Sequence, residues 1–184
     1  MSVTKSLFIS TDYFKEVTAL NQNVDDVQVR AIILSSQRLY IEPVIGTDLF
    51  NAIVTKIQAS SLTGDYQTLT NSWIAPALTW WSMVELVPNL AVDMSRGGVY
   101  RSQAENSSTA TIQELNYLTG KYRARAEHFT NRLVDYLCSN SNLFPEYSTN
   151  SDEDLRPSRD KQYNSIWLGD TSETEYEKRT GQRY

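Results

Sequence analysis

The residues that could perform nucleophilic or acid–base catalysis are few in this chain and form no catalytic pattern. His128 is the one histidine and Cys138 the one cysteine of the sequence. A serine–histidine–acid triad would have to use His128, and no Gly-x-Ser-x-Gly turn accompanies it. We interpret His128 as a structural or surface residue and Cys138 as a small buried residue near a helix end. The sequence therefore does not predict an enzyme, and no cofactor is expected.

Carboxylates, which can bind divalent cations, stand close together at three places. Asp25 and Asp26 fall at the start of an expected helix, where acids interact favourably with the helix dipole. Glu85 lies inside an apolar helical segment with Asp93 further along, and we interpret its position as a helix face that turns toward solvent. The third group lies near the C-terminus and consists of Asp152, Glu153 and Asp154. Weak binding of a divalent cation by this third group stays open.

A Gly-Thr-Asp turn at residues 46–48 has two readings, a phosphate-binding loop or a simple reversal of the chain. The turn lacks further glycines and a following lysine, and Asp48 would occupy the position of the anion. We therefore expect a turn between two helices, in which Pro43 ends the first helix and Gly46 supplies a free backbone angle. In this interpretation Thr47 caps the second helix and Asp48 interacts with its dipole.

Two polar segments carry the residues that we expect to bind partners. Residues 95–110 are rich in Gly and Ser, and such a long connection inside a compact domain is typically functional or mobile. Its candidate contact residues are Arg96, Tyr100, Arg101 and Gln103. They could bind DNA phosphates or an acidic neighbour, and we favour a protein contact.

The second segment is the C-terminal arm, residues 148–184, which is poor in large apolar side chains. So few apolar groups cannot offset the conformational entropy lost on ordering, so we expect a partner to order this arm. Its candidate anchor consists of Tyr163, Ile166, Trp167 and Leu168. A buried Trp flanked by aliphatic residues is typical of an interface hot spot.

The elements that must position these segments are helical. The spacing of apolar residues predicts helices over residues 8–20, 23–42, 47–61 and 66–94, the last interrupted by Pro76 and Pro88. In the second helix the apolar stripe consists of Val27, Ala31, Leu34 and Ile41, widened by Val29, Ile32, Ile33 and Tyr40. A capping box at 111–114 predicts the start of the last helix, which ends near residue 140. A short alternating piece at 99–103 could form a strand. The fold class is therefore all-α, a helical bundle of about five helices over residues 1–147, with a long polar loop before the last helix.

The length, net charge and composition of the chain disfavour or exclude several classes of function. The chain has 184 residues, enough for one domain with a full core. A net charge of −5 disfavours a protein whose main task is to bind nucleic acid. One cysteine and one histidine are too few for an internal disulfide or a Cys/His zinc site. The apolar run near the N-terminus is too short for a signal peptide or a membrane span, so we expect a soluble protein made in the cytoplasm.

Three stretches also resemble a known family. They are "NVDDVQVRAIILSSQRLYIEPVIGTDLFNAI" (23–53), "WIAPALTWWSMVELVP" (73–88) and "YRARAEHFTNRLVDYLCSNSNLFPEY" (122–147). Their order, the polar loop and the arm resemble the head-to-tail connector (adaptor) proteins of tailed bacteriophages, in particular those of crAss-like phages. The resemblance covers residues 8–147 and leaves out the arm. It implies a structural virion protein that acts at the neck between head and tail.

The resemblance further implies particular partners. Connector subunits form a homo-oligomeric ring, usually a dodecamer, that stacks beneath the portal protein and offers a docking surface to tail or further ring proteins. DNA passes through the ring without sequence-specific binding, and no membrane is involved. Two other hypotheses stay open. One is a monomeric or low-oligomer helical interaction module without a virion role, and the other is an enzyme with a metal site at Asp152, Glu153 and Asp154.

Overall fold

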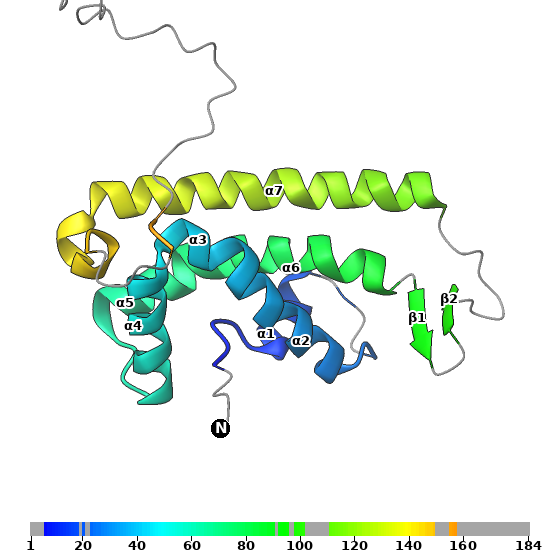
Figure 1. Cartoon of the computed structure of the whole chain (residues 1–184), viewed down its shortest axis with the longest axis horizontal. Helices are drawn as coiled ribbons and strands as arrows, with labels where there is room; N and C mark the ends of the chain where they lie inside the picture. The colour runs from blue at the N-terminus through cyan, green and yellow to red at the C-terminus, as the bar shows by residue number, and fades with distance from the viewer. Residues whose placement is uncertain are drawn as a thin grey trace, which may run out of the picture.

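The computed structural model describes residues 6–18, 20, 23–90, 92–95, 98–101, 111–149 and 155–157. For 92–95 and 98–101 it describes the backbone alone. Over these residues the fold is all-α, with one small hairpin (Figure 1). The helices are α1 (Thr11–Thr18), α2 (Asp26–Ser36), α3 (Glu42–Ile45), α4 (Thr47–Gln58), α5 (Gly64–Thr68), α6 (Ala75–Leu90) and α7 (Ile112–Ser139). Short 3₁₀ turns at Ser141–Leu143 and Pro145–Tyr147 follow α7.

The helix that was expected to end at Pro43 continues past it. A π-helical turn, Gln37–Ile41, joins α2 directly to α3, and Pro43 lies in the first turn of α3. Proline lacks an amide hydrogen and its ring collides with the carbonyl four residues earlier in a regular helix. In the π turn the Glu42 amide donates to the Gln37 carbonyl, five residues back. The wider turn carries the helix through the proline, and the chain breaks only at Gly46.

The same arrangement recurs before Pro76. The π-helical segment Leu69–Ile74 joins α5 to α6, and the Ala75 amide donates to the Thr70 carbonyl. The expected interruption is thus a change of helix type, since helical structure runs from Gly64 to Leu90. Pro88 lies inside the last turn of α6 and does not end it at once. Within the described residues, the seven helices therefore form five continuous helical segments, in agreement with the bundle of about five helices.

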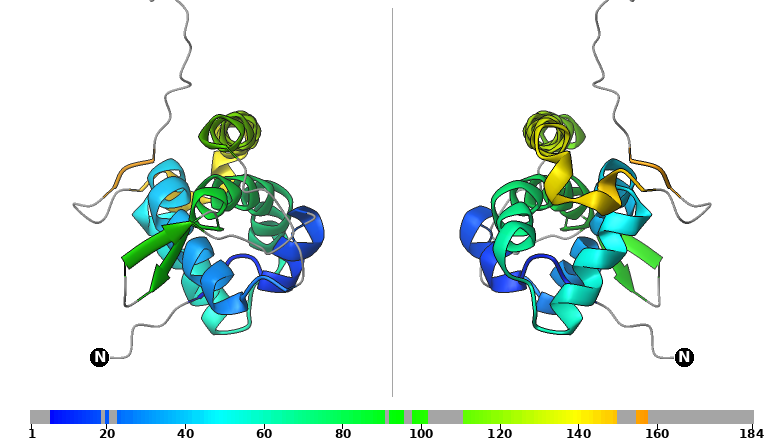
Figure 2. Two further views of the ribbon diagram at one scale, coloured as in Figure 1. Left: turned by 90° about the vertical axis from the view of Figure 1, so that its right-hand side faces the viewer. Right: turned by 90° about the vertical axis from the view of Figure 1, so that its left-hand side faces the viewer.

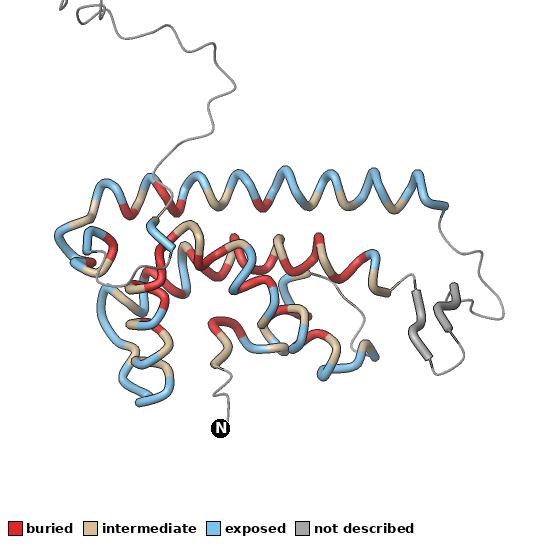
Figure 3. Tube along the Cα trace, viewed as in Figure 1, coloured by how far each residue is buried: buried red, intermediate tan, exposed pale blue. Residues whose placement is uncertain are grey.

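Helix α6 is the centre of the fold. It packs against α7 along much of its length and also contacts α1 and α2, so it lies between α7 and the two N-terminal helices (Figures 1 and 2). Its buried residues come from all sides of the helix, as the low polarity of its sequence requires. Its buried members are Ala75, Ala77, Leu78, Thr79, Ser82, Met83, Val84, Leu86 and Val87. The burial pattern in Figure 3 follows this arrangement, with buried residues concentrated on α6 and on the faces turned toward it.

The buried face of α2 differs from the first stripe expected. Val27 is 73 % exposed and Ala31 is also exposed, whereas Val29 and Ile33 are fully buried. The π turn then brings Gln37 and Ile41 to the buried side. A stripe at regular α-helical spacing that ends on Ile41 selects the wrong face, because the π turn shifts the phase of the helix.

Helix α7 begins at the expected capping box. The Glu114 amide donates to Thr111 Oγ1 at 3.3 Å, and the Thr111 amide donates to Glu114 Oε2 at 2.8 Å. The hydrogen bonds that the Thr111 amide and hydroxyl donate to the Glu114 carboxylate lower the pKa of Glu114. The helix extends over 28 residues, and only Ala126, Leu133, Val134 and Leu137 are buried. Most of its surface therefore faces solvent, as the pale blue outer side in Figure 3 shows.

A two-stranded antiparallel hairpin follows α6. Strand β1 (Val92–Ser95) pairs with β2 (Gly98–Arg101), with Val92 opposite Arg101 and Ser95 opposite Gly98. The expected strand at 99–103 is thus confirmed in part, with bounds shifted toward the N-terminus. Residues 92–94, which were assigned to the preceding helix, form its partner strand.

Candidate functional site

The contact residues expected from the sequence fall largely outside the described residues. This holds for Arg96 and Gln103, for the anchor Tyr163, Ile166, Trp167 and Leu168, and for the acidic triplet Asp152, Glu153 and Asp154. Tyr100 and Arg101 lie in β2, where the backbone alone is described, opposite Asp93 and Val92. The contact roles of these residues stay predictions.

The Gly-Thr-Asp turn holds a piece of the chain's own C-terminal segment. The Thr47 amide donates to the Leu155 carbonyl at 3.1 Å. Gly46 has φ +81°, and a Cβ built on it would lie 2.8 Å from Cδ of Pro157. Thr149 Oγ1 also donates to Asp48 Oδ2 at 3.3 Å. The turn therefore serves as the anchor point of the first part of the C-terminal arm, which includes Thr149 and Leu155–Pro157.

Thr47 is not the N-cap that the sequence suggested. The N-cap of α4 is Gly46, and Thr47 is the first helical residue. Its hydroxyl is buried and has no hydrogen-bond partner among the described residues. The cap prediction was wrong because the close approach of residues 155–157 uses the amide of Thr47, and a threonine side chain cannot cap a helix from inside its first turn.

Glu85 takes part in a polar network between three helical segments. It accepts a very short hydrogen bond from the hydroxyl of Tyr40, which lies in the π turn. The Tyr40 ring stacks on Trp81 with ring centres 4.1 Å apart, and Trp81 Nε1 donates to Thr130 Oγ1 of α7 at 3.0 Å. Burial, followed by the hydrogen bond to Glu85, raises the pKa of Tyr40 to about 12. Glu85 does not simply turn toward solvent, since it joins α6 to the π turn.

Stacked aromatic rings and arginines form a second set of contacts between α6 with its preceding π turn and α7. Trp80 stacks on Tyr122 with ring centres 5.5 Å apart, and the Arg125 guanidinium lies 4.7 Å from the centre of the Trp80 ring. Seven residues before Trp80, Trp73 stacks on Tyr136 with ring centres 4.4 Å apart. The Arg132 guanidinium lies 5.2 Å from the centre of the Trp73 ring. The sequence signal was present, because the two tryptophans stand seven residues apart, but it was read as core spacing alone.

A second polar contact lies at the α5 end of the body. The Tyr66 hydroxyl donates to Glu146 Oε2 at 2.7 Å, and the Lys56 ammonium lies 4.3 Å from the centre of the Tyr66 ring. Burial and the hydrogen bond to Glu146 raise the pKa of Tyr66. This contact holds the turn after α7 against α5, so it is structural in character.

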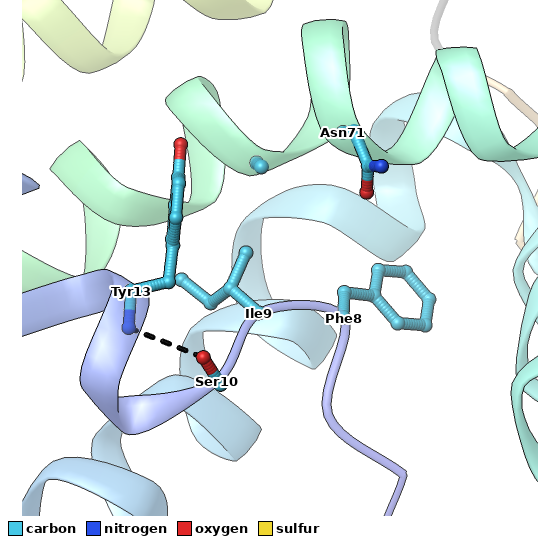
Figure 4. Close-up of a pocket in the computed structure, with 6 residues that line it drawn as sticks. Phe8, Ile9, Ser10, Tyr13 and Asn71 are labelled. Atoms are coloured by element: carbon cyan, nitrogen blue, oxygen red, sulfur yellow. Dashed lines mark hydrogen bonds between the residues drawn. The ribbon is translucent and has the colours of Figure 1, made fainter.

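A pocket of about 380 Å³ lies between the N-terminal segment and the start of α6 (Figure 4). Its lining consists of Phe8, Ile9, Ser10, Tyr13, Asn71 and Ala75. Ser10 Oγ accepts the Tyr13 amide at 3.1 Å and is thereby engaged as a helix cap. Burial raises the pKa of Tyr13, which keeps the hydroxyl neutral. The lining offers one side-chain amide and two hydroxyl groups and includes no charged side chain.

His128 and Cys138 both lie on the surface of α7. His128 contacts the Phe129 ring edge-on, in agreement with the surface interpretation. Cys138 was expected to be buried and is exposed, with its sulfur 3.9 Å from the Tyr147 hydroxyl. The neighbouring Leu137 occupies the buried position instead. In the part of the chain that the structure describes, no group of three or more His, Cys, Asp or Glu side chains is placed to hold a metal ion.

Comparisons with known proteins give a family. None of the described helices is both long enough and apolar enough to cross a membrane. Neither the curated proteins nor the solved structures returned a match. A family model, described as a family of unknown function (DUF6712), matches residues 41–156. The match begins at the end of the π turn before Pro43, includes the Gly46 turn, and ends at Arg156 where the C-terminal segment contacts that turn. Because it covers more than half of the chain, the protein belongs to the DUF6712 family.

Proposed function

We propose that this protein is a structural subunit of a head-to-tail connector ring in a tailed bacteriophage. In this role copies of the chain assemble into a ring that joins the portal protein to tail or further ring proteins and surrounds the DNA exit channel. The proposal is supported by the resemblance of residues 23–53, 73–88 and 122–147 to connector proteins. It is also supported by the order of parts, an all-helical body with a long last helix that follows a hairpin and a polar connection.

The observation that carries the proposal is the anchoring of the C-terminal segment on the body. The Thr47–Leu155 hydrogen bond and the contact of Pro157 with Gly46 fix the point from which residues 158–184 depart. Because the arm starts from a fixed point, its apolar residues can extend only a limited distance from the body. This arrangement suits a protein whose arm binds a neighbour in an assembly.

The length of the arm suits a neighbouring subunit. Trp167 stands ten residues beyond Pro157. Ten extended residues span at most about 33–36 Å, roughly the diameter of a small domain. This span is long enough for Trp167, with its flanking Ile166 and Leu168, to contact the body of an adjacent copy or of a stacked ring protein.

The charge of the chain agrees with a DNA channel through which DNA must move. With a net charge of −5 the protein as a whole repels the phosphate backbone, so passing DNA would be bound weakly. In this proposal the protein is not an enzyme and requires no cofactor.

The test is assembly of the full chain, alone and mixed with a portal protein, followed by mass photometry and negative-stain microscopy. The expected result is closed rings under at least one of these conditions. A protein that stays monomeric in both would contradict the connector role and favour a helical interaction module.

Truncation after Pro157 tests the arm without disturbing its anchor. The truncated chain should keep the helical circular dichroism of the full chain and lose or weaken assembly. Trp167→Ala is the point variant, and it should weaken assembly by about 2 kcal/mol or more if Trp167 is a hot spot. Assembly that is unchanged in both variants would remove the arm from the mechanism.

A further inference from the structure

One exposed side of α7 carries a patch that combines apolar and basic side chains. Tyr117 is 66 % exposed and Leu118 36 % exposed. Lys121 and Arg125 follow at spacings of four and eight residues from Tyr117, which places the four side chains along one side of the helix. The Lys121 ammonium lies 4.7 Å from the centre of the Tyr117 ring. We call these four residues the α7 patch.

The basic groups of the α7 patch have no acidic partner within the described part of the body. The ion pairs there join Lys15 to Asp26 and Arg38 to Glu42, and neither involves α7. Each basic group of the α7 patch instead has a cation–π contact, Lys121 with Tyr117 and Arg125 with Trp80. A basic surface with exposed apolar groups is complementary to a partner that offers acidic and apolar groups.

The chain itself presents a surface of the matching composition on the other side of the body. Helix α1 exposes Asp12 and Glu16, together with Val17, which is 44 % exposed. At the start of α2, Asp25 is exposed beside Val27, which is 73 % exposed. We call these five residues the α1–α2 patch.

A buried lysine holds the two halves of the α1–α2 patch together. Lys15 Nζ donates to the Val24 carbonyl at 2.6 Å and pairs with Asp26 at 2.5 Å. It thereby fixes the end of α1 against the start of α2. Lys15 is itself engaged, and the exposed acids Asp12, Glu16 and Asp25 lie on the two elements that it joins, so the patch is acidic.

The two patches cannot meet within one molecule, because α6 lies between α7 and the N-terminal helices (Figures 1 and 2). We propose that the α7 patch of one copy binds the α1–α2 patch of the next copy. Lys121 and Arg125 would then face Asp12, Glu16 and Asp25, while Tyr117 and Leu118 pack near Val17 and Val27. This inference rests on the proposed function, and it names the surfaces through which ring subunits join.

Different patches on the two partners make the contact head-to-tail. Each copy uses its α7 patch toward one neighbour and its α1–α2 patch toward the other. Such a heterologous contact repeats from copy to copy and closes into a ring when the rotation between copies permits closure. A symmetric pair would instead bring like charges together, which costs free energy and disfavours a closed dimer through either patch.

Charge exchange between the patches tests the contact. One variant carries Lys121→Glu and Arg125→Glu, and the other carries Asp12→Lys and Glu16→Lys. Each variant alone should raise the protein concentration needed for half-maximal assembly by about tenfold or more, since like charges then face each other. A chain with all four changes should recover assembly, and so should an equimolar mixture of the two variants, in which alternate copies match. Glu127→Lys is the control, because it stands two residues from Arg125 and hence on the opposite flank of α7.

A second variant keeps the test informative if a charge change affects folding. Tyr117→Ser alters no charge and no buried side chain, and it should weaken assembly while the thermal unfolding temperature of the monomer stays unchanged. If all of these variants form rings as readily as the wild type, the proposed contact is overturned and the connector role is not. A wild-type chain that never assembles would instead contradict the connector role. If the Lys121→Glu/Arg125→Glu variant loses salt-dependent binding to duplex DNA while it assembles normally, the α7 patch is a DNA surface and the contact between copies is overturned.

Discussion

The hydroxyl of Tyr40 donates a hydrogen bond to the carboxylate of Glu85, and this contact joins the π turn before Pro43 to the central helix α6. The Tyr40 ring also stacks on Trp81, whose indole nitrogen donates to Thr130 of α7. Three helical segments thus meet through one tyrosine. Removal of its hydroxyl should therefore lower the stability of the body.

Tyr40→Phe should lower the free energy of unfolding by about 1–2 kcal/mol, because a hydrogen bond to a charged group is lost while the ring contact with Trp81 is retained. Urea unfolding followed by circular dichroism measures the change. Tyr117→Phe is the matched control, since its ring is mostly exposed, and it should leave the stability of the monomer unchanged. A Tyr40→Phe protein as stable as the wild type would mean that the hydrogen bond contributes nothing net.

The same tyrosine should make the protein sensitive to alkaline pH. Its pKa is raised from 10.0 to about 12 in the folded state, so the folded protein holds the phenol proton more tightly than the unfolded chain. The resulting stabilisation is fully present below pH 10 and is lost as the pH rises from about 10 to about 12. Tyr40→Phe should therefore show a shallower loss of stability across this range. Tyrosinate absorbance gives an independent check, since the variant should lack one late-ionising tyrosine, and an unchanged titration would contradict the raised pKa.

Gly46→Ala should destabilise the body and loosen the base of the C-terminal arm. The φ of +81° with an extended ψ costs a non-glycine residue about 1–3 kcal/mol, and the new Cβ would press on the Pro157 ring. Thermal unfolding measures the loss, and limited proteolysis after residue 149 detects release of the arm base.

Variants at two other glycines separate the cost of the backbone conformation from the cost of the contact with Pro157. Gly64 has φ +61° with nothing near its Cβ position, so Gly64→Ala reports the backbone cost alone, about 1 kcal/mol. Gly120 lies inside α7 with open space around it, so Gly120→Ala should raise stability by about 0.5–1 kcal/mol. If Gly46→Ala costs no more than Gly64→Ala, the contact with Pro157 does not constrain the turn.

Gln37→Met should release the N-terminal segment from the body. The buried Gln37 side chain accepts the Phe8 amide at 2.9 Å and donates to the Ser6 carbonyl at 3.1 Å. Methionine fills a similar volume but leaves both backbone groups without a partner, at a cost of about 1–3 kcal/mol. Urea unfolding and proteolysis near residue 8 report the change, with Gln58→Met at the exposed end of α4 as control. Equal protease resistance in the two variants would show that packing of Phe8 alone holds the segment.

Lys15→Met should separate α1 from the start of α2. The buried ammonium binds the Val24 carbonyl and Asp26, and methionine keeps only the aliphatic part of the side chain. We expect a loss of about 1–3 kcal/mol in the free energy of unfolding and faster amide exchange in α1. Arg30→Met, on the exposed side of α2, should change neither. Unchanged amide exchange in the Lys15 variant would show that Lys15 does not fix α1 against α2.

The all-α fold was predictable because most of its signals are local. The capping box at Thr111 and Glu114 and the apolar spacing of the following residues define α7 without reference to any other part of the chain. The break at Gly46 was likewise visible, because a glycine between two apolar helical segments marks a turn. Such features depend on neighbours a few residues away, which the sequence displays directly.

The errors come from contacts that join distant segments. Thr47 looked like an N-cap, but its amide is taken by Leu155, which is more than a hundred residues further along the chain. Pro43 looked like a helix end and Pro76 like an interruption, but each is preceded by a π turn that carries the helix onward. Single-residue rules of proline and threonine are statistical preferences, and tertiary packing overrides them at these positions.

The candidate contact surfaces were harder to predict than the fold. The residues singled out by composition, such as Arg96 and Trp167, lie outside the described residues. The α7 patch was not predicted because regular helical spacing assigns Leu118 to the apolar stripe of the last helix and does not single out Tyr117. Only the burial of each residue separates Leu115, which packs on the core, from Leu118 on the surface.

The two π turns have a consequence for how related sequences should be aligned. A π turn holds one residue more than an α turn, so it behaves as a single inserted residue that leaves the rest of the helix intact. A family member that lacks one residue within 37–41 or 69–74 would return that stretch to a regular α-helix without losing a helix. In an alignment, a gap of one position at either place would therefore not indicate a lost helix. The proline that follows each π turn should be absent from the sequences that carry the gap.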